Sequence, residues 1–379
     1  MPAPDTLGSS VSAQRPSLAS RLSRSSIPGL DAARAVAVSL VVLYHFGLDA
    51  VPGATGVTIF FVLSGFLITW LLLREYEGTG TISFKDFYLR RGLRIFPAFY
   101  FYWAVGTIIY VVRDHPMDWG LTWSSLAYVT NYYLALVPNH GDHFLGHTWS
   151  LAIEEQFYLL WPIGLWMFRR DLRRMTQALI VAIVCIWIYR AGLCLAGVSD
   201  SYLYHAFDTR ADQLLIGCLT AVCAKRGLLE GFAMRLARRP IYLVATAVLL
   251  YISVAMPVPQ LMYRYTVGYP IQECFIVVLL LQLIMLSGAG IWSWTEWSPV
   301  RYLGRISYSV YLWQQLTLFT SARVTSQFPL VVQLAFALVV TVAFAAISFH
   351  FIERPFLRLK DRLRHTTPVV KSPAVAIAG

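Results

Sequence analysis

Long apolar runs with few charged residues recur along the whole chain. A run of about 20 such residues can cross the hydrocarbon core of a membrane as an α-helix. At that length the runs predict about ten spans, and an even number of spans returns the chain to the side on which it started. The predicted spans are residues 30–48, 54–73, 96–113, 149–168, 175–196, 209–224, 240–256, 268–287, 302–321 and 330–352.

The composition supports this membrane assignment. Of the 379 residues, 57% are hydrophobic and 13% are charged, whereas a soluble domain has about 25% charged residues. We therefore predict an all-α fold, a polytopic bundle of transmembrane helices. The five cysteines lie in or near predicted spans without the spacing of metal ligands or of a disulfide framework. No metal cofactor is predicted.

The basic residues indicate the orientation of the bundle. The net charge is +11, and nearly all Lys and Arg residues fall in the tails and in the loops on one side of the predicted spans. Cytoplasmic loops are enriched in these residues, so both termini are predicted to be cytoplasmic. The charge thus reflects topology, and no nucleic-acid partner is predicted. The residues outside this pattern are Arg34, Arg113, Arg190, Arg210, Arg264 and Arg323.

The two ends of the chain differ from its apolar middle. Residues 1–26 are rich in Arg and Ser and lack the apolar run of a secretory signal. Such a composition also occurs in organellar transit peptides, but we predict a disordered cytoplasmic tail. Residues 27–356 hold all the predicted spans. The basic residues 357–379 are predicted to form a second disordered cytoplasmic tail.

The first predicted span carries two ionisable residues. Arg34 and His45 are eleven residues apart, which is about 16 Å of helix and three turns, so both side chains lie on nearly the same face. Ionisable residues inside a membrane usually face the protein interior or an aqueous cavity. The pair therefore predicts a polar track. The alternative is that Arg34 only anchors the helix and that His45 is a core histidine bonded to a backbone carbonyl.

Three arginines precede the third predicted span. Arg90, Arg91 and Arg94 are spaced so that they can share one helix face, and Pro97 is expected to start the span. Guanidinium groups bind phosphate through paired hydrogen bonds, which predicts a phosphate site. The alternative is that these arginines only hold the helix end against anionic lipid headgroups.

Several polar residues are predicted to lie at the depth of His45. Glu154 and Glu155 are about 8 Å below the outer boundary by helical rise, and His45 is about 21 Å above the inner boundary if Asp31 caps its helix. In a core of about 30 Å these depths coincide. Structural salt bridges are the alternative to a site. The same count brings Arg190, Asp208, Arg210, Asp212, Gln314 and Gln315 near this layer.

Together these segments resemble the acyltransferase-3 family of integral membrane acyltransferases. The resemblance covers residues 27–356 and rests on several motifs in a fixed order. Members commonly have a histidine after YLW, where this chain has Gln314. The motifs are LDAARAVAVSLVVLYH, with Arg34 and His45; RRGLRIFP, with Arg91 and Arg94; HTWSLAIEEQFYLLWP; TRADQLLIG; LGRISYSVYLW; and IERPF.

The resemblance implies an enzyme of the bacterial cytoplasmic (inner) membrane. Such enzymes transfer an acyl group, most often acetyl, from cytoplasmic acyl-CoA, which serves as co-substrate. The acceptor is typically a hydroxyl of a lipid-linked or cell-surface glycan, and one branch instead acylates small molecules such as macrolides. The residues expected to bind the CoA donor are Arg34, Arg90, Arg91 and Arg94.

The predicted chemistry centres on His45. An imidazole is mostly neutral and basic at neutral pH, so His45 is expected to act as general base toward the acceptor hydroxyl or as a transient acyl carrier. Glu154 or Glu155 is expected to orient the imidazole and to stabilise its protonated form. The residues expected to line the acceptor side are Trp149, Asp208, Arg210 and Asp212.

Two other classes of protein fit parts of this pattern. A secondary transporter also has charged groups in the membrane, but usually shows internal repeats and helices broken by Gly or Pro at matched positions, and neither is visible here. A scaffold that only contacts membrane lipids does not need His45 and Glu154 at one depth. An acyltransferase is therefore the preferred interpretation.

Overall fold

The computed structural model describes residues 17–24, 26–138, 143–238, 241–255, 261–288 and 290–365. Within these ranges every regular element is a helix, which confirms the all-α prediction for this part of the chain. Five helices are long and apolar enough to cross a membrane, while a count of ten spans stays a prediction. The five are Gly53–Thr79, Phe84–Val112, Leu172–Leu195, Arg264–Leu286 and Leu330–Leu359.

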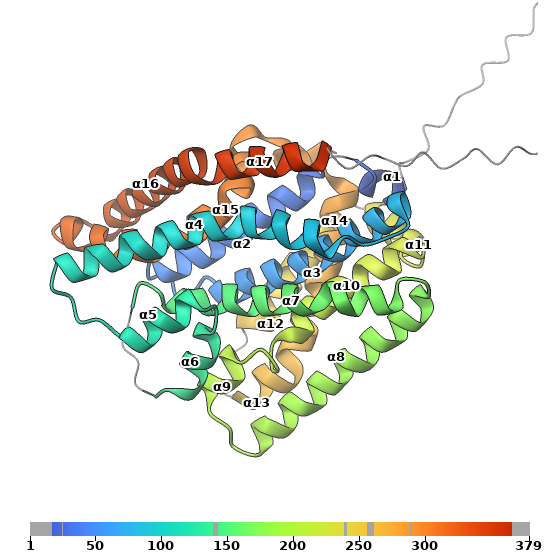
Figure 1. Cartoon of the computed structure of the whole chain (residues 1–379), viewed down its shortest axis with the longest axis horizontal. Helices are drawn as coiled ribbons and strands as arrows, with labels where there is room; N and C mark the ends of the chain where they lie inside the picture. The colour runs from blue at the N-terminus through green and yellow to red at the C-terminus, as the bar shows by residue number, and fades with distance from the viewer. Residues whose placement is uncertain are drawn as a thin grey trace, which may run out of the picture.

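The first long helix occupies the centre of the bundle. Helix α2 (Pro28–His45) packs between α3 (Gly53–Thr79) and α15 (Ser298–Thr325). On its other side α3 packs against α10 (Ala211–Lys225), and α15 packs against α16 (Leu330–Ser348). This arrangement encloses α2 (Figure 1), so polar residues on its faces point into the protein.

The remaining helices surround this centre (Figure 1). Each of the ten predicted spans overlaps a helix of the structure, although the bounds differ. The other long helices are α4 (Phe84–Val112), α7 (Trp149–Phe168), α8 (Leu172–Leu195), α12 (Ile241–Ala255) and α14 (Tyr269–Leu286). The short ones are α1 (Leu18–Leu22), α5 (Trp119–Leu126), α6 (Thr130–Leu136), α9 (Asp200–His205), α11 (Glu230–Arg238) and α13 (Leu261–Tyr263).

Helix α4 begins twelve residues earlier than predicted. Its N-cap is Ser83, whose side chain accepts a hydrogen bond from the Asp86 N–H, and Pro97 lies inside the helix rather than at its start. The helix continues through Pro97, although proline lacks the N–H that would bond to the carbonyl four residues back and its ring crowds that carbonyl. The arginines of the RRGLR segment are therefore part of the same helix as the predicted span.

Glycines allow α3 and α10 to touch along their backbones. A Cβ atom added at Gly65 would lie 1.9 Å from the Leu214 carbonyl oxygen, and one at Gly217 would lie 2.0 Å from the Val62 carbonyl oxygen. Small residues permit such close helix approach in membrane proteins. The neighbouring Ser64 hydrogen-bonds Glu154 of α7 at 2.8 Å, so it joins two helices through its side chain.

The two ends of the described chain lie at the same end of the bundle. Helix α1 and the C-terminal end of α17 (Arg354–His365) are both at the upper right of Figure 1. Helix α1 lies within residues 1–26, and α17 extends into residues 357–379. Each of the two segments predicted to be disordered therefore contains helix. In α1, Leu18 and Leu22 are buried, and the Leu18 N–H donates to Glu230 of α11. Residues 1–16 and 366–379 lie outside the described residues.

Candidate active site

A cavity lies among α2, α3, α4, α7 and α15. Its empty volume is about 710 Å³, including the part that opens to the outside. We call it the arginine cavity because three guanidinium groups line it. The polar and ionisable lining residues are Arg34, Ser64, Arg91, Arg94, Ser150, Glu154, Ser307, Tyr308 and Tyr311.

Two of the three arginines are available to a ligand. In the described part of the chain, Arg34 and Arg94 make no ion pair and no hydrogen bond, although both line the cavity. The carboxylates that act on them most strongly are Asp31 for Arg34 and Glu353 for Arg94. Two unpaired guanidinium groups in one cavity favour the binding of an anion with several oxygen atoms.

Arg91 has protein partners instead. Its Nη2 lies 4.0 Å from Glu154 Oε2 and its Nε lies 3.9 Å from Glu155 Oε1, and its guanidinium carbon is 3.4 Å from the centre of the Tyr158 ring. Ser64 and Tyr158 donate hydrogen bonds to Glu154 at 2.8 and 3.3 Å. The two glutamates thus hold Arg91 in the cavity wall.

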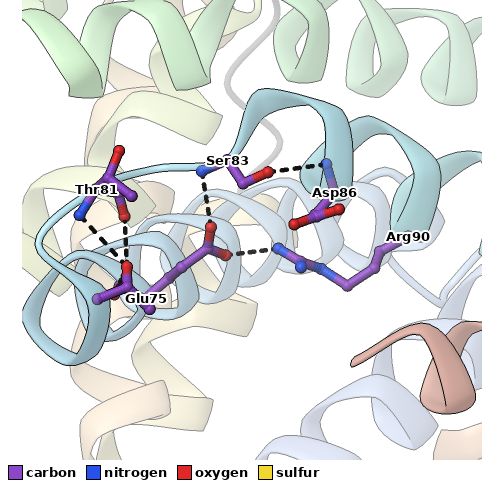
Figure 2. Close-up of polar contacts among 6 residues, drawn as sticks. Glu75, Thr81, Ser83, Asp86 and Arg90 are labelled. Carbon is purple, nitrogen blue, oxygen red and sulfur yellow. Dashed lines mark hydrogen bonds and ion pairs between the residues drawn. The ribbon is translucent and has the colours of Figure 1, made fainter. Parts of the chain in front are cut away.

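Arg90 points elsewhere, in contrast to the prediction. Its Nη2 forms an ion pair of 2.6 Å with Glu75 at the end of α3, and Glu75 also accepts the backbone N–H of Ser83 at 2.9 Å. Figure 2 shows these contacts around the turn from α3 to α4. Arg90 is not among the cavity-lining residues, because one residue in a helix turns the side chain by about 100°. It secures the turn.

A second, smaller cavity surrounds His45 and has an empty volume of about 310 Å³. His45 is the last residue of α2. We call this space the histidine cavity, since His147, from the 3-10 turn Gly146–Thr148, also lines it. Its aromatic lining residues are Tyr44, Trp149, Tyr204 and Tyr311.

Both histidines have free ring nitrogens within the described residues. Nδ1 of His45 and both ring nitrogens of His147 are buried without a hydrogen bond of good geometry, although backbone carbonyl groups lie beside both rings, Val41 for His45 and Phe144 and Leu312 for His147. The Gln314 side chain lies beside the His45 ring, yet its amide atoms complete no hydrogen bond of good geometry. The imidazole of His45 is therefore free to exchange a proton with a ligand, which is what a general base requires.

The two cavities meet at Val57 and Tyr311, which line both. The Tyr311 hydroxyl donates to the His147 carbonyl oxygen at 2.8 Å and lies 2.6 Å from Ser150 Oγ. Ser150 lines the arginine cavity. A group bound among the arginines and a group bound beside His45 are therefore separated only by this wall.

Of the four residues predicted for the acceptor side, one lines the histidine cavity and three do not. Trp149 lines the histidine cavity. Arg210 is fully buried. Its guanidinium carbon lies 4.3 Å from the Tyr269 ring centre and 5.6 Å from the Trp149 ring centre. Neither it nor the two aspartates line either cavity.

The two aspartates have structural partners. Asp212 is fully buried and forms an ion pair of 2.5 Å with Arg190 of α8. Asp208 accepts hydrogen bonds from three tyrosine hydroxyls, which link it to α6, α8 and α9. The three are Tyr132 at 3.3 Å, Tyr189 at 3.1 Å and Tyr202 at 3.0 Å.

Comparison with known proteins agrees with this geometry. The family model described as an acyltransferase domain matches residues 27–350. The chain belongs to the acyltransferase-3 family.

Two curated relatives of this acyltransferase are peptidoglycan O-acetyltransferase OatA of Listeria monocytogenes and O-acetyltransferase OatA of Staphylococcus aureus. The first is 31% identical over 355 residues, which is 88% of this chain and 56% of the relative. The second is 30% identical over 350 residues, 87% of this chain and 57% of the relative. The chain therefore spans a little more than half the length of these relatives. No solved structure matches it.

The structure of this acyltransferase separates residues that helical counting placed at one depth. The glutamates contact Arg91, and neither is hydrogen-bonded to His45, so the predicted pairing is not found. Helix α2 begins at Pro28 and ends at His45, which places His45 at the C-terminal end of its helix. Trp149 lies at this level, and Glu154 lies five residues, or about 7.5 Å, further along α7.

Sequence reasoning missed two residues of the site. His147 lies just before a predicted span and Tyr311 lies inside one. Both were part of motifs, HTWSL and YSVYLW, but a histidine in a connection and a tyrosine among apolar residues carry no periodic signal of their own. Only the fold shows that they border the same cavity as His45.

Proposed function

We propose that this acyltransferase is a membrane O-acetyltransferase that moves an acetyl group from acetyl-CoA to a hydroxyl of a cell-wall or cell-surface glycan. The observation that carries the proposal is the junction of a cationic cavity with a cavity that contains free histidine nitrogens. The O-acetyltransferase relatives support the same chemistry. The site belongs to the bacterial cytoplasmic membrane, with the CoA donor on the cytoplasmic side.

The donor binds in the arginine cavity. Among the described residues the guanidinium groups of Arg34 and Arg94 have no ion-pair partner there, and each can form two parallel hydrogen bonds to a phosphate group of the donor. Val57, Phe60 and Phe61 provide an apolar wall for the uncharged arm that ends in the thioester. The donor's phosphates enter from the end that carries α1 and α17, and the thioester points toward Tyr311.

The acceptor binds in the histidine cavity. The rings of Tyr44, Trp149 and Tyr204 line it, and aromatic faces suit the apolar face of a sugar ring. His45 accepts the proton of the acceptor hydroxyl, and the hydroxyl oxygen attacks the thioester carbonyl carbon. The bond between that carbon and sulfur breaks, and the CoA thiolate takes up the proton. The products are an O-acetylated glycan and free CoA.

Tyr311 places the two reactants. The thioester carbonyl must reach the wall formed by Val57 and Tyr311, because the wall borders both cavities. The Tyr311 hydroxyl already donates its proton to the His147 carbonyl oxygen, which fixes the phenol ring at the boundary. His147 stands beside this point with both ring nitrogens free.

The proposal is tested with purified protein in lipid nanodiscs, acetyl-CoA labelled in the acetyl group, and purified soluble peptidoglycan strands as acceptor. We expect label to appear on the glycan as a base-labile ester. The proposal is wrong if the wild-type protein neither binds acetyl-CoA nor transfers its acetyl group. Arg90→Ala serves as the control variant, because Arg90 lies outside both cavities.

A further inference from the structure

A short π-helix interrupts the last long helix of the chain. Residues Phe349–Glu353 connect α16 to α17, and the Arg354 N–H bonds to the Phe349 carbonyl oxygen five residues back. Such π-turns are rare and occur often at functional sites, because the wide turn changes which side chains face inward. Here Glu353 is only 4% exposed, while Phe351 is 74% exposed. The turn directs an acidic side chain into the protein.

The buried Glu353 carboxylate has two neighbours. The Ser309 hydroxyl of α15, itself fully buried, donates a hydrogen bond to Glu353 Oε1. On the other side, the π-helix packs against α4, and the charge of Glu353 acts on Arg94. A carboxylate is costly to bury unless hydrogen bonds and an opposite charge compensate it. Ser309 and Arg94 supply that compensation.

Arg94 has fewer protein partners than Arg91. Arg91 has two glutamates and a tyrosine ring that hold it. In the described part of the chain Arg94 has no ion pair and no hydrogen bond, and the carboxylates whose charges act on it include Glu353 and Asp31. Glu353 does not line the arginine cavity, whereas Arg94 does. Glu353 can therefore act on a donor only through residues that line the cavity, and among those that its charge acts on Arg94 is the cationic one.

We propose that Glu353 is a positioning residue for the donor site: it is fixed by Ser309 and orients the Arg94 guanidinium toward the arginine cavity without occupying its N–H donors. The inference rests on the proposed function, because it takes the donor's phosphates as the ligand of Arg94. The π-helix Phe349–Glu353 is the element that brings the carboxylate within range of α4. A guanidinium has five N–H donors in a fixed plane, so its orientation decides whether two of them reach one phosphate.

The direct test is equilibrium binding of acetyl-CoA to purified Glu353→Gln protein in nanodiscs, together with steady-state transfer. Glutamine keeps the shape and can still accept from Ser309, but it lacks the charge. We expect the donor's Kd and KM to rise about tenfold, in the range of coupling between contacting residues, with kcat nearly unchanged. Glu353→Asp should give a smaller rise. The matched control is Glu77→Gln, which removes another carboxylate at the same end of the bundle, one paired with Lys225.

A double variant shows whether Glu353 acts through Arg94. If it does, Glu353→Gln combined with Arg94→Ala should bind acetyl-CoA no more weakly than Arg94→Ala alone. Additive losses would overturn the inference, as would unchanged donor affinity in Glu353→Gln. Wild-type protein that does not bind acetyl-CoA at all would instead contradict the proposed function. A melting temperature within a few degrees of wild type excludes misfolding as the cause.

Discussion

At the scale of single residues, the arginine cavity makes its three arginines unequal. Arg34 and Arg94 line it without an ion pair or hydrogen bond to the described residues, Arg91 lines it close to two glutamates, and Arg90 is paired with Glu75 outside it. Sequence spacing alone predicted one cluster. We therefore propose that donor recognition rests mainly on Arg34 and Arg94, and that Arg90 and Arg91 have a more structural share.

This inequality predicts how alanine variants differ. Arg34→Ala and Arg94→Ala should each weaken acetyl-CoA binding by roughly 10- to 100-fold, because a hydrogen bond to a charged group contributes about 1.5–3 kcal/mol. Lysine at either position should restore only part of the affinity, since it lacks the planar fork. Arg90→Ala is the internal comparison and should leave the donor's Kd unchanged. Titration calorimetry measures all of these variants, and equal losses in all three would contradict the assignment.

The sequence predicted these residues better than it predicted their partners. The spacing of Arg34 and His45 correctly placed both on faces of α2 that line cavities. The partnership of His45 with Glu154 failed because it depended on where two helices start and end, and α2 ends at His45 itself. The true partner of Glu154 is Arg91, which belongs to a helix whose first twelve residues were predicted to be a connection.

At the scale of helices, the contact between α3 and α10 sets the width of the site. Helix α3 contributes Val57, Phe60, Phe61 and Ser64 to the arginine cavity. Its backbone touches α10 at Gly65, and any side chain there must push the helices apart. Helix α3, a long apolar helix that was simple to predict, is therefore positioned by its close contact with α10 at Gly65.

Gly65→Val should therefore destabilise the protein. The new Cβ would lie 1.9 Å from the Leu214 carbonyl oxygen, and a backbone atom cannot yield as a flexible side chain can. Overpacking of this kind costs about 1–3 kcal/mol or more, so we expect a melting temperature several degrees lower in detergent and weaker donor binding. Gly231→Ala, in α11, is the control, because nothing lies within 4 Å of its added Cβ. A wild-type melting curve for Gly65→Val would show that α3 and α10 are not in contact.

At the scale of the whole molecule, the two cavities lie at different levels along α2. Arg34, in the first half of α2, lines the arginine cavity, and His45, the last residue of α2, lines the histidine cavity. The apolar pattern predicted the positions of the helices well. It could not predict the cavities, because these depend on which faces of α2, α4, α7 and α15 meet.

Labelling of single cysteines tests the predicted orientation of the chain. In a background without the native cysteines, Gln327→Cys, in the exposed turn between α15 and α16, should react with an impermeant thiol reagent on intact cells. Gly231→Cys, in α11 at the other end, should react only after the membrane is opened. Both positions are exposed. The opposite pattern would invert the topology and would place the arginine cavity away from the cytoplasmic CoA pool.

The central claim is that donor recognition and proton removal occur in two adjacent cavities, the second at His45. The measurement that tests it most directly is a paired assay of acetyl-CoA binding and acetyl transfer on His45→Gln, with Arg94→Ala as its counterpart. His45→Gln should bind the donor with a wild-type Kd and transfer acetyl 10²- to 10⁴-fold more slowly, the usual loss of general-base assistance. Arg94→Ala should instead bind the donor more weakly than wild type. Near-normal transfer by a folded His45→Gln protein would contradict the account.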